Sequence, residues 1–171
     1  HPKTKLWVTV GGGGRSHKFL NNPSAMLRSI RKVLNEQGLH GVDFNNEELR
    51  THKDYADYAS FIRNTANLLH QEGYQVSVAL HAGQLIDQSV YKSVDRVNLM
   101  TYDMQGASYH ADFGKMREAI DKLVHAGCPK EKILVGLPAY GRHKHTREPE
   151  TYSTLADHAM QHENVGLQGL S

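Results

Sequence analysis

Five short apolar runs recur along the chain, and a segment with helical spacing follows each of the first four. The runs lie at residues 6–10, 39–44, 74–80, 96–102 and 133–138. They lack the strict alternation of a half-exposed strand, which is typical of strands that are buried on both faces. Because each connection is long enough for a helix, the pattern predicts parallel strands joined by helical crossovers. The predicted fold class is therefore α/β.

The connecting segments carry apolar residues three or four positions apart, which is the spacing of an amphipathic helix. We expect helices at about 23–37, 54–71, 85–93 and 113–126, and a weaker helix at 151–161. Two architectures accommodate these elements: an open doubly wound sheet, or part of a (β/α)₈ barrel, which typically takes eight units and about 250 residues. Periodicity alone does not separate the two.

Composition excludes several classes of function. The chain has 171 residues, about one domain, with a formal net charge of +2 and no basic block interleaved with aromatic residues. We therefore expect no nucleic-acid partner. No stretch approaches the roughly 18 to 20 apolar residues of a membrane helix, so we expect no membrane partner either. The lone Cys128 leaves no intrachain disulfide framework and lies in no nucleophile motif, and the oligomeric state is not indicated.

The end of the second apolar run is the most informative place to look for a site, because ligands of parallel α/β folds gather at the carboxyl ends of strands. It reads His-Gly-Val-Asp-Phe-Asn-Asn-Glu over residues 40–47. Side chains of a strand alternate between faces, so Asp43, Asn45 and Glu47 are predicted to share one face. The alternative is that residues 45–48 form a solvated loop that caps the next helix.

Three other runs end in residues that could reach the same rim. The first ends in Thr9-Val10-Gly11-Gly12, where missing side chains allow close approach to the backbone. The fourth ends in Met-Thr-Tyr-Asp over residues 100–103, and the fifth in Pro-Ala-Tyr-Gly-Arg over residues 138–142. Two phenols, a carboxylate and a guanidinium are thus candidates for one rim.

In this order the four segments resemble glycoside hydrolase family 18, the chitinases and chitinase-like proteins. That family has a Ser-x-Gly-Gly-like strand end, then Asp-x-x-Asp-x-Asp-x-Glu, then Met-x-Tyr-Asp, then a Tyr-Gly-Arg element, and the match runs from Leu6 to about Arg142. The resemblance implies a (β/α)₈ TIM-type barrel, of which the five βα units here would supply the third to seventh strands. Since five strands cannot close such a barrel, we expect residues 1–171 to be one incomplete chitinase-like domain of a longer chain; the alternative is that the family's fold has been remodelled.

The resemblance also implies a reaction: retaining hydrolysis of β-1,4-linked N-acetylglucosamine polymers, assisted by the acetamido group of the substrate. It assigns the acid to Glu47, the acetamide-orienting position to Asn45 and a supporting carboxylate to Asp43. It requires no metal and no cofactor, and it implies an extracellular or secretory location. The residues that it assigns to binding of chitin or other N-acetylglucosamine glycans lie on the other strand ends: Gly11, Gly12, Met100, Tyr102, Asp103, Tyr140 and Arg142.

The sequence departs from the family pattern at its centre. His40 stands for the first Asp, Asn45 for the third, and Asn46 for the aromatic residue before the acid, while Trp7 is the sole tryptophan. A neutral Asn45 cannot stabilise developing positive charge, and the loss of one such preorganised group commonly costs about 10²- to 10³-fold in rate. Two hypotheses follow: a weak chitinase, or an inactive chitinase-like lectin that binds chito-oligosaccharides.

Other kinds of site are less well supported. The loop Gly11–Gly14 could cradle a phosphate, but Ser16 stands where the dinucleotide fingerprint needs Gly or Ala, and the P-loop spacing is absent. A cation could bind Asp43, Glu47 and Asp103, although the family resemblance gives all three a metal-free use. Four histidines of the C-terminal part could bind a metal but lack a third ligand at a recognisable spacing, so solvated loop histidines are favoured. They are His143, His145, His158 and His162.

Overall fold

A computed structural model describes residues 3–14, 20–104 and 109–161 of the chain. Along the chain the elements are β1 (Trp7–Gly11), α1 (Pro23–Glu36), β2 (Gly41–Asn45), α2 (His52–Gln71), β3 (Gln75–His81), α3 (Gln88–Ser93), β4 (Arg96–Met100), α4 (Phe113–His125), the 3₁₀ turn η1 (Lys130–Lys132), β5 (Ile133–Gly136), β6 (Tyr140–Arg142), β7 (Pro149–Thr151) and α5 (Tyr152–Gln161).

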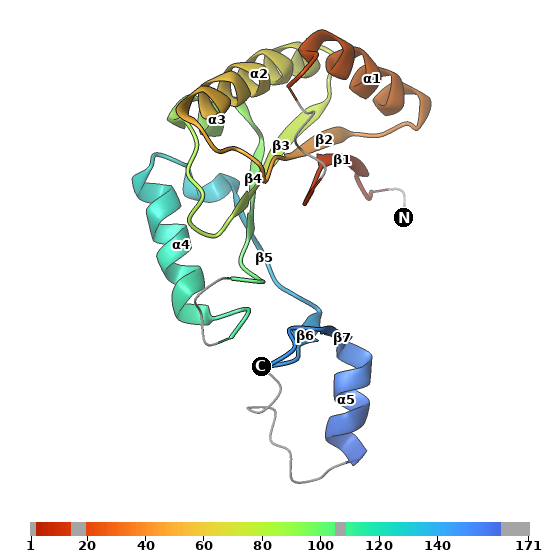
Figure 1. The fold of residues 1–171 in the computed structure, drawn as a ribbon. Coiled ribbons are helices and arrows are strands. Elements are labelled where there is room, and N and C mark those ends of the chain that lie inside the picture. The colour runs from red at the N-terminus through yellow and green to blue at the C-terminus, as the bar shows by residue number, and fades with distance from the viewer. Residues whose placement is uncertain (1–2, 15–19, 105–108, 162–171) are drawn as a thin grey trace.

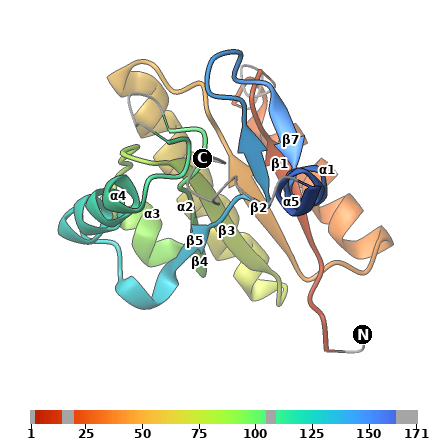
Figure 2. The same ribbon diagram turned by 90° about the horizontal axis from the view of Figure 1, so that it is seen from below.

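Strands β1 to β5 form one parallel sheet, and their order across the sheet is their order along the chain. Figure 1 shows α1 to α4 on one side of this sheet, and Figure 2 shows the five strands from below in the order β1 to β5. The predicted α/β class with five parallel strands is therefore confirmed.

The core lies between the sheet and its helices. Val42, Phe44, Val76 and Val78 are buried on the helix-facing side of β2 and β3. They belong to one cluster with apolar residues of the helices, among which Leu34, Ile62, Leu69, Tyr91 and Leu123 are fully buried. Because side chains alternate along a strand, the residues between them, such as Asp43, face the opposite side of the sheet. That opposite face is where the candidate site lies.

Local signals explain where the helices begin. The side chain of Asn22 accepts a hydrogen bond from the backbone N–H of Ala25, with Pro23 at the first position of α1. Thr51 and Asp54 form a reciprocal capping box, so α2 begins at His52, two residues before the predicted start. Helix α5 confirms the predicted helix at 151–161. None of the described helices has both the length and the apolar character that crossing a membrane requires.

The antiparallel pair β6–β7 was not predicted from the sequence. Strand ends also differ from the apolar runs by one or two residues: β3 extends to His81, and β4 ends at Met100 instead of residue 102. Ladder hydrogen bonds, and not apolarity, decide where a strand ends, so a polar residue such as His81 is included when it still pairs with β4.

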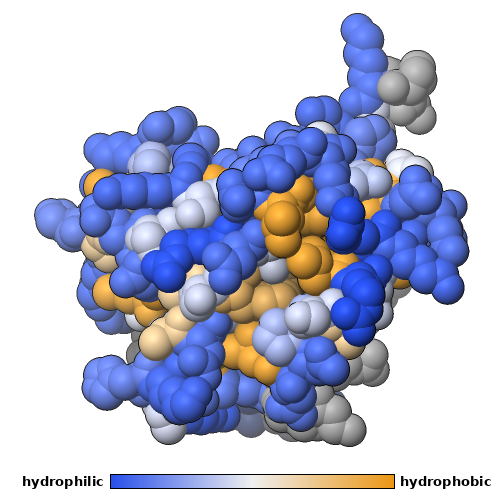
Figure 3. Space-filling view, turned by 90° about the horizontal axis from the view of Figure 1, so that it is seen from above, coloured by the Kyte–Doolittle hydropathy of each residue, from blue (hydrophilic) through white to orange (hydrophobic). Residues whose placement is uncertain are grey.

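Figure 3 shows apolar side chains gathered on the face formed by α1 and α2. A hollow of about 430 Å³ lies between these helices and is lined by Leu20, Leu27, Phe61 and Leu68, among others. This hollow is on the helical side of the sheet, so it is separate from the polar strand ends described next.

Candidate functional site

Asp43 is the buried centre of the predicted row. Its Oδ1 accepts hydrogen bonds from Ser77 Oγ at 2.5 Å and from Asn98 Nδ2 at 2.8 Å, and its Oδ2 lies 3.5 Å from Thr9 Oγ1. These donors come from β3, β4 and β1, so one carboxylate ties together the inner face of four strands. Burial of a carboxylate is costly without such partners, and here they are provided by neutral side chains.

Glu47 lies just beyond the end of β2, with 21% of its side chain exposed. Its Oε1 accepts a hydrogen bond from Asn45 Nδ2 at 2.9 Å, and its Oε2 lies 3.0 Å from His81 Nε2. Gly13 packs against it: a Cβ at that glycine would lie 3.5 Å from Oε2. The predicted pairing of Asn45 with Glu47 on one face is thus present, and Glu47 remains partly open to a ligand.

Residues 46–50 do form a loop that leads to the cap of α2, but residues 45–48 are buried or half-buried, so the expected solvation is wrong. Asn46 is buried, and its side-chain oxygen accepts a hydrogen bond from the backbone N–H of Glu48 at 3.1 Å. The Gln84 side chain donates to the backbone carbonyl of Asn46 at 3.3 Å, and the following helix is capped by Thr51. The segment is therefore held in place by its neighbours, and this fixes the position of Glu47.

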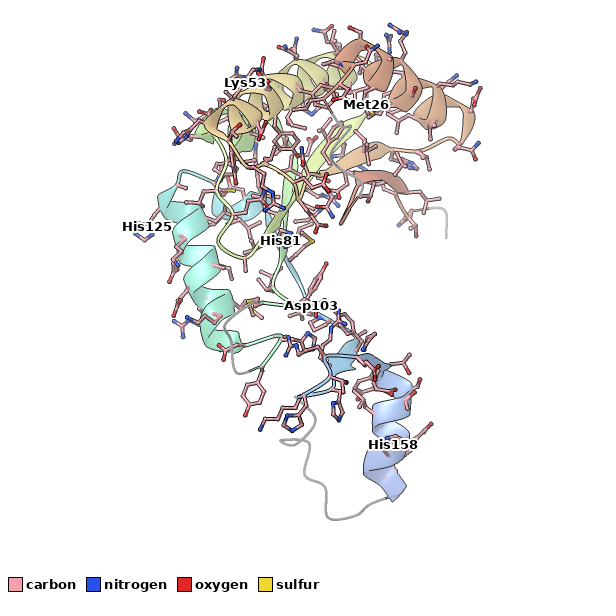
Figure 4. The ribbon with its side chains drawn as sticks, viewed as in Figure 1. Met26, Lys53, His81, Asp103, His125 and His158 are labelled. Atoms are coloured by element: carbon pink, nitrogen blue, oxygen red, sulfur yellow. The ribbon has the colours of Figure 1, made fainter. Side chains whose placement is uncertain are left out.

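His81 is the functional candidate that the sequence reasoning missed. It is the last residue of β3, next to β2, and its imidazole faces Glu47 across the two strand ends. Figure 4 shows His81 on the inner side of the strands, whereas Lys53 and His125 lie on the outer helices. The rule that pointed to residues 43–47, a polar residue ending an apolar run, also applies here, because His81 directly follows Leu80.

Asp103 is clamped by the two polar residues of β6. Arg142 donates from Nε to Oδ1 at 2.6 Å and from Nη2 to Oδ2 at 2.7 Å, and the hydroxyl of Tyr140 donates to Oδ2 at 2.7 Å. His110 Nδ1 lies 3.5 Å from Oδ1. Such a bidentate arginine–carboxylate pair combines charge with fixed geometry. The predicted gathering of Asp103, Tyr140 and Arg142 at one rim is present, and their side chains bind one another.

The clamp changes the acidity of its members. Hydrogen bonds from Arg142 are the main reason that the pKa of Asp103 falls to about 2. Burial, together with the hydrogen bond to Asp103, raises the pKa of Tyr140 to about 12, and the same carboxylate raises the pKa of Arg142. Asp103 also has a φ of 52°, in the left-handed region that is uncommon outside glycine. The clamp therefore holds an ionised Asp103 in an unusual backbone conformation.

Tyr102 links this clamp to the Glu47 group. Its ring packs on Gly136 and lies edge-on to Tyr140, with ring centroids 6.4 Å apart. Burial, and next the charge of Asp103 and of Glu47, raise the pKa of Tyr102. A cavity of about 410 Å³ opens at these strand ends, and its lining includes His81, Met100, Tyr102 and Asp103 as well as residues of α4. This volume is large enough for a small ligand.

Gly11 and Gly12 turn the chain at the end of β1. Their φ angles are 102° and 109°, and the N–H of Gly12 donates to the carbonyl of Asn45 at 2.8 Å. Within the described residues no group of three or more His, Cys, Asp or Glu side chains could hold a metal ion. Ser16 and His162 lie outside the described residues, and Cys128 is buried, with its pKa raised to about 11 by desolvation.

A family model described as Glycosyl hydrolases family 18 matches residues 1–166. The chain belongs to glycosyl hydrolase family 18. Over 200 residues, this family 18 chain is 26% identical to "Probable chitinase 2" of Drosophila melanogaster, a match that covers 99% of this chain and 40% of that protein. It is 22% identical over 179 residues to "Chitinase-3-like protein 2" of Homo sapiens, covering 82% and 46% respectively. The chain thus spans less than half the length of these two relatives.

The solved structures agree on the fold. The GH18 chitinase from Cycas revoluta in complex with (GlcNAc)3 superposes with a TM-score of 0.80 at 17% identity, covering 94% of this chain and 62% of that one. The predicted family is confirmed by the family model, and the parallel α/β arrangement by this likeness.

Each departure from the family 18 pattern has a local role here. Nδ1 of His40 accepts a hydrogen bond from the backbone N–H of Leu6, with 3.1 Å between the two nitrogens. This bond joins the chain before β1 to the start of β2. Asn45 donates to Glu47, and Asn46 holds the backbone of the same segment. Asn45 and Asn46 therefore help to keep Glu47 in place, and the neutral amide of Asn45 carries no charge.

Proposed function

We propose that this site binds β-1,4-linked N-acetylglucosamine chains and hydrolyses them slowly, with Glu47 as the proton donor. The observation that carries the proposal is the placement of Glu47: it follows β2 in the row that starts at Asp43, is partly exposed, and is held by Asn45 and His81. Carboxylic acids held at such a strand end are suited to protonating a leaving-group oxygen.

In the proposed reaction, Glu47 gives its proton to the glycosidic oxygen as the bond from that oxygen to the anomeric carbon breaks. The carbonyl oxygen of the substrate acetamide attacks the same carbon and forms a cyclic oxazolinium ion. Water then attacks the anomeric carbon and gives a proton back to the Glu47 carboxylate, so the configuration is retained. No protein nucleophile is used.

Asn45 explains why the reaction would be slow. Its amide oxygen can accept a hydrogen bond from the acetamide N–H, but it carries no charge to stabilise the oxazolinium ion. Loss of one preorganised electrostatic group typically costs about 10²- to 10³-fold in rate. Asp43 lies deeper, where it is bound by Ser77 and Asn98 and supports the row from below.

We place the glycan over the other strand ends. The cavity lined by His81, the neighbour of Glu47, is also lined by Met100 and Tyr102, which offer apolar contact and one hydroxyl. Tyr140 and Arg142 form the rim through Asp103. The structurally similar chitinase from Cycas revoluta was solved in complex with (GlcNAc)3, which supports this class of ligand. A location outside the cell belongs to the same proposal, because it depends on the family resemblance.

A lectin is the second candidate, and one observation favours it. Both carboxylate oxygens of Glu47 are engaged, Oε1 by an amide N–H that can act only as a donor. This arrangement suits a carboxylate acceptor at least as well as a proton donor. Under this proposal the same cavity binds chito-oligosaccharides without turnover.

Mass spectrometry of a chito-oligosaccharide incubated with the purified protein separates the two, with binding followed by calorimetry in the same buffer. Shorter products that disappear in Glu47→Gln, but persist in the matched variant Glu36→Gln on α1, support the enzyme. Saturable binding without products supports the lectin. If neither binding nor products are observed, both proposals are contradicted. Asn45→Asp tests the stated cause of slowness, since turnover should rise.

A further inference from the structure

His81 and Glu47 are in contact where β3 and β2 end. Oε1 of Glu47 already accepts the amide N–H of Asn45, so Oε2 is the oxygen that faces an imidazole nitrogen able to give or take a proton. Oε2 and Nε2 are 3.0 Å apart, which is hydrogen-bond distance. The side chain of His81 is 50% exposed, so protons exchange freely between it and solvent.

The two partners differ in what they can do at this contact: an ionised carboxylate only accepts hydrogen bonds, whereas an imidazole that takes up a proton donates from both ring nitrogens. A proton on Nε2 also creates an ion pair with the carboxylate across the same 3.0 Å. Among the described charged groups that line the cavity with His81, Asp103 pairs with Arg142 and Lys115 pairs with Glu118. The titratable or charged side chains that line the cavity with His81 are Tyr102, Asp103, Lys115, Glu118 and Lys122.

We propose that His81 is a positioning residue that takes up the proton of the site and, once protonated, holds Glu47 as a carboxylate in its present orientation. The inference rests on the proposed function, in which Glu47 must itself carry a proton to cleave the glycosidic bond. His81 therefore restrains hydrolysis in acid, where Glu47 would otherwise be most often protonated. It adds to Asn45 a second reason for slow turnover.

Turnover measured against pH tests this restraint. His81→Gln keeps a side-chain N–H donor but cannot take up a proton, so its turnover relative to the unaltered protein should rise about two- to fivefold as the pH falls from 8 to 5. A purely structural role would change turnover by the same factor at every pH. The matched control is His70→Gln, since His70 makes a similar 2.8 Å contact with Asp95 at the other end of the sheet. A ratio that is constant with pH, or a rise of equal size in His70→Gln, would overturn the proposal.

A double-mutant cycle gives a readout that needs no turnover. His81→Gln, Glu47→Gln and the double variant are unfolded in urea at pH 5 and at pH 8, and the coupling is taken from the unfolding equilibrium constants. We expect coupling of about two- to fivefold at pH 5 and a smaller value at pH 8, where an unperturbed imidazole is neutral. Coupling that is absent at pH 5 would refute the proposal. If turnover is absent in every variant while the coupling is present, the hydrolase proposal fails and the pairing of His81 with Glu47 stands.

Discussion

Replacement of Asp103 by Asn should loosen the connection between β6 and the end of β4. The variant loses the charge that Arg142 and Tyr140 both contact, while its size is nearly unchanged. A carboxyl whose pKa falls from 3.8 to about 2 on folding would contribute roughly 2.4 kcal/mol to stability if it were fully shielded. The Asp103 side chain is 38% exposed, so screening by solvent reduces the expected loss to about 1 kcal/mol.

Urea unfolding followed by circular dichroism at 222 nm measures this loss as a function of pH. Because the folded pKa of Asp103 is lowered, its contribution is present above about pH 4 and is lost as the pH falls towards 2. The difference between the unaltered protein and Asp103→Asn should therefore shrink over that interval. Asp157→Asn is the control, since Asp157 is exposed on α5 and forms no ion pair with any described residue. A difference that stays constant down to pH 2, or that appears equally in the control, would refute the reasoning.

Three further substitutions probe the sheet and its caps. Ser77→Ala removes the 2.5 Å donor to the buried Asp43 and should cost about 1 to 2 kcal/mol in the free energy of unfolding measured with urea. Gly41→Ala would place a Cβ 2.5 Å from a backbone oxygen of β3, so calorimetry should show a lower Tm from about 1 to 3 kcal/mol of overpacking; an unchanged Tm would contradict that contact. Thr51→Ala removes the capping box of α2 and should cost about 1 kcal/mol in thermal unfolding, with Thr51→Ser largely restoring it.

Much of the sheet could be predicted because buried parallel strands have a direct signature. Runs such as 133–138 are apolar on both faces, and segments with helical spacing separate the runs. Strands β6 and β7 have no such signature: each has three residues, and all three residues of Pro149–Thr151 are exposed. A pair of this kind forms because β6 is held to Asp103 and α5 follows it, and neither contact can be recognised from local sequence.

The sequence was enough to predict which residues share a strand face or a strand end at the candidate site. It was not enough to predict which side-chain atoms are in contact. Alternation along a strand was enough to place Asn45 and Glu47 together, and strand ends were enough to bring Tyr140 towards Asp103. Which atoms meet depends on register and rotamers, which periodicity does not contain. His81 directly follows the apolar run that ends at Leu80, so its position at a strand end could be recognised from the sequence, but its contact with Glu47 could not.

The order of the strands has a consequence for how the chain folds. Each strand of the sheet pairs with the strand before it, so during synthesis β1 and β2 can join as soon as the second has left the ribosome, and each later unit adds to an edge that already exists. Among the five described strands, each finds a partner in the unit directly before or after it, which favours rapid folding of this part of the sheet. The effect of a substitution that prevents a strand from pairing therefore depends on which strand it is in. Loss of β5 leaves four strands able to pair, whereas loss of β3 divides the sheet into two separate pairs of strands.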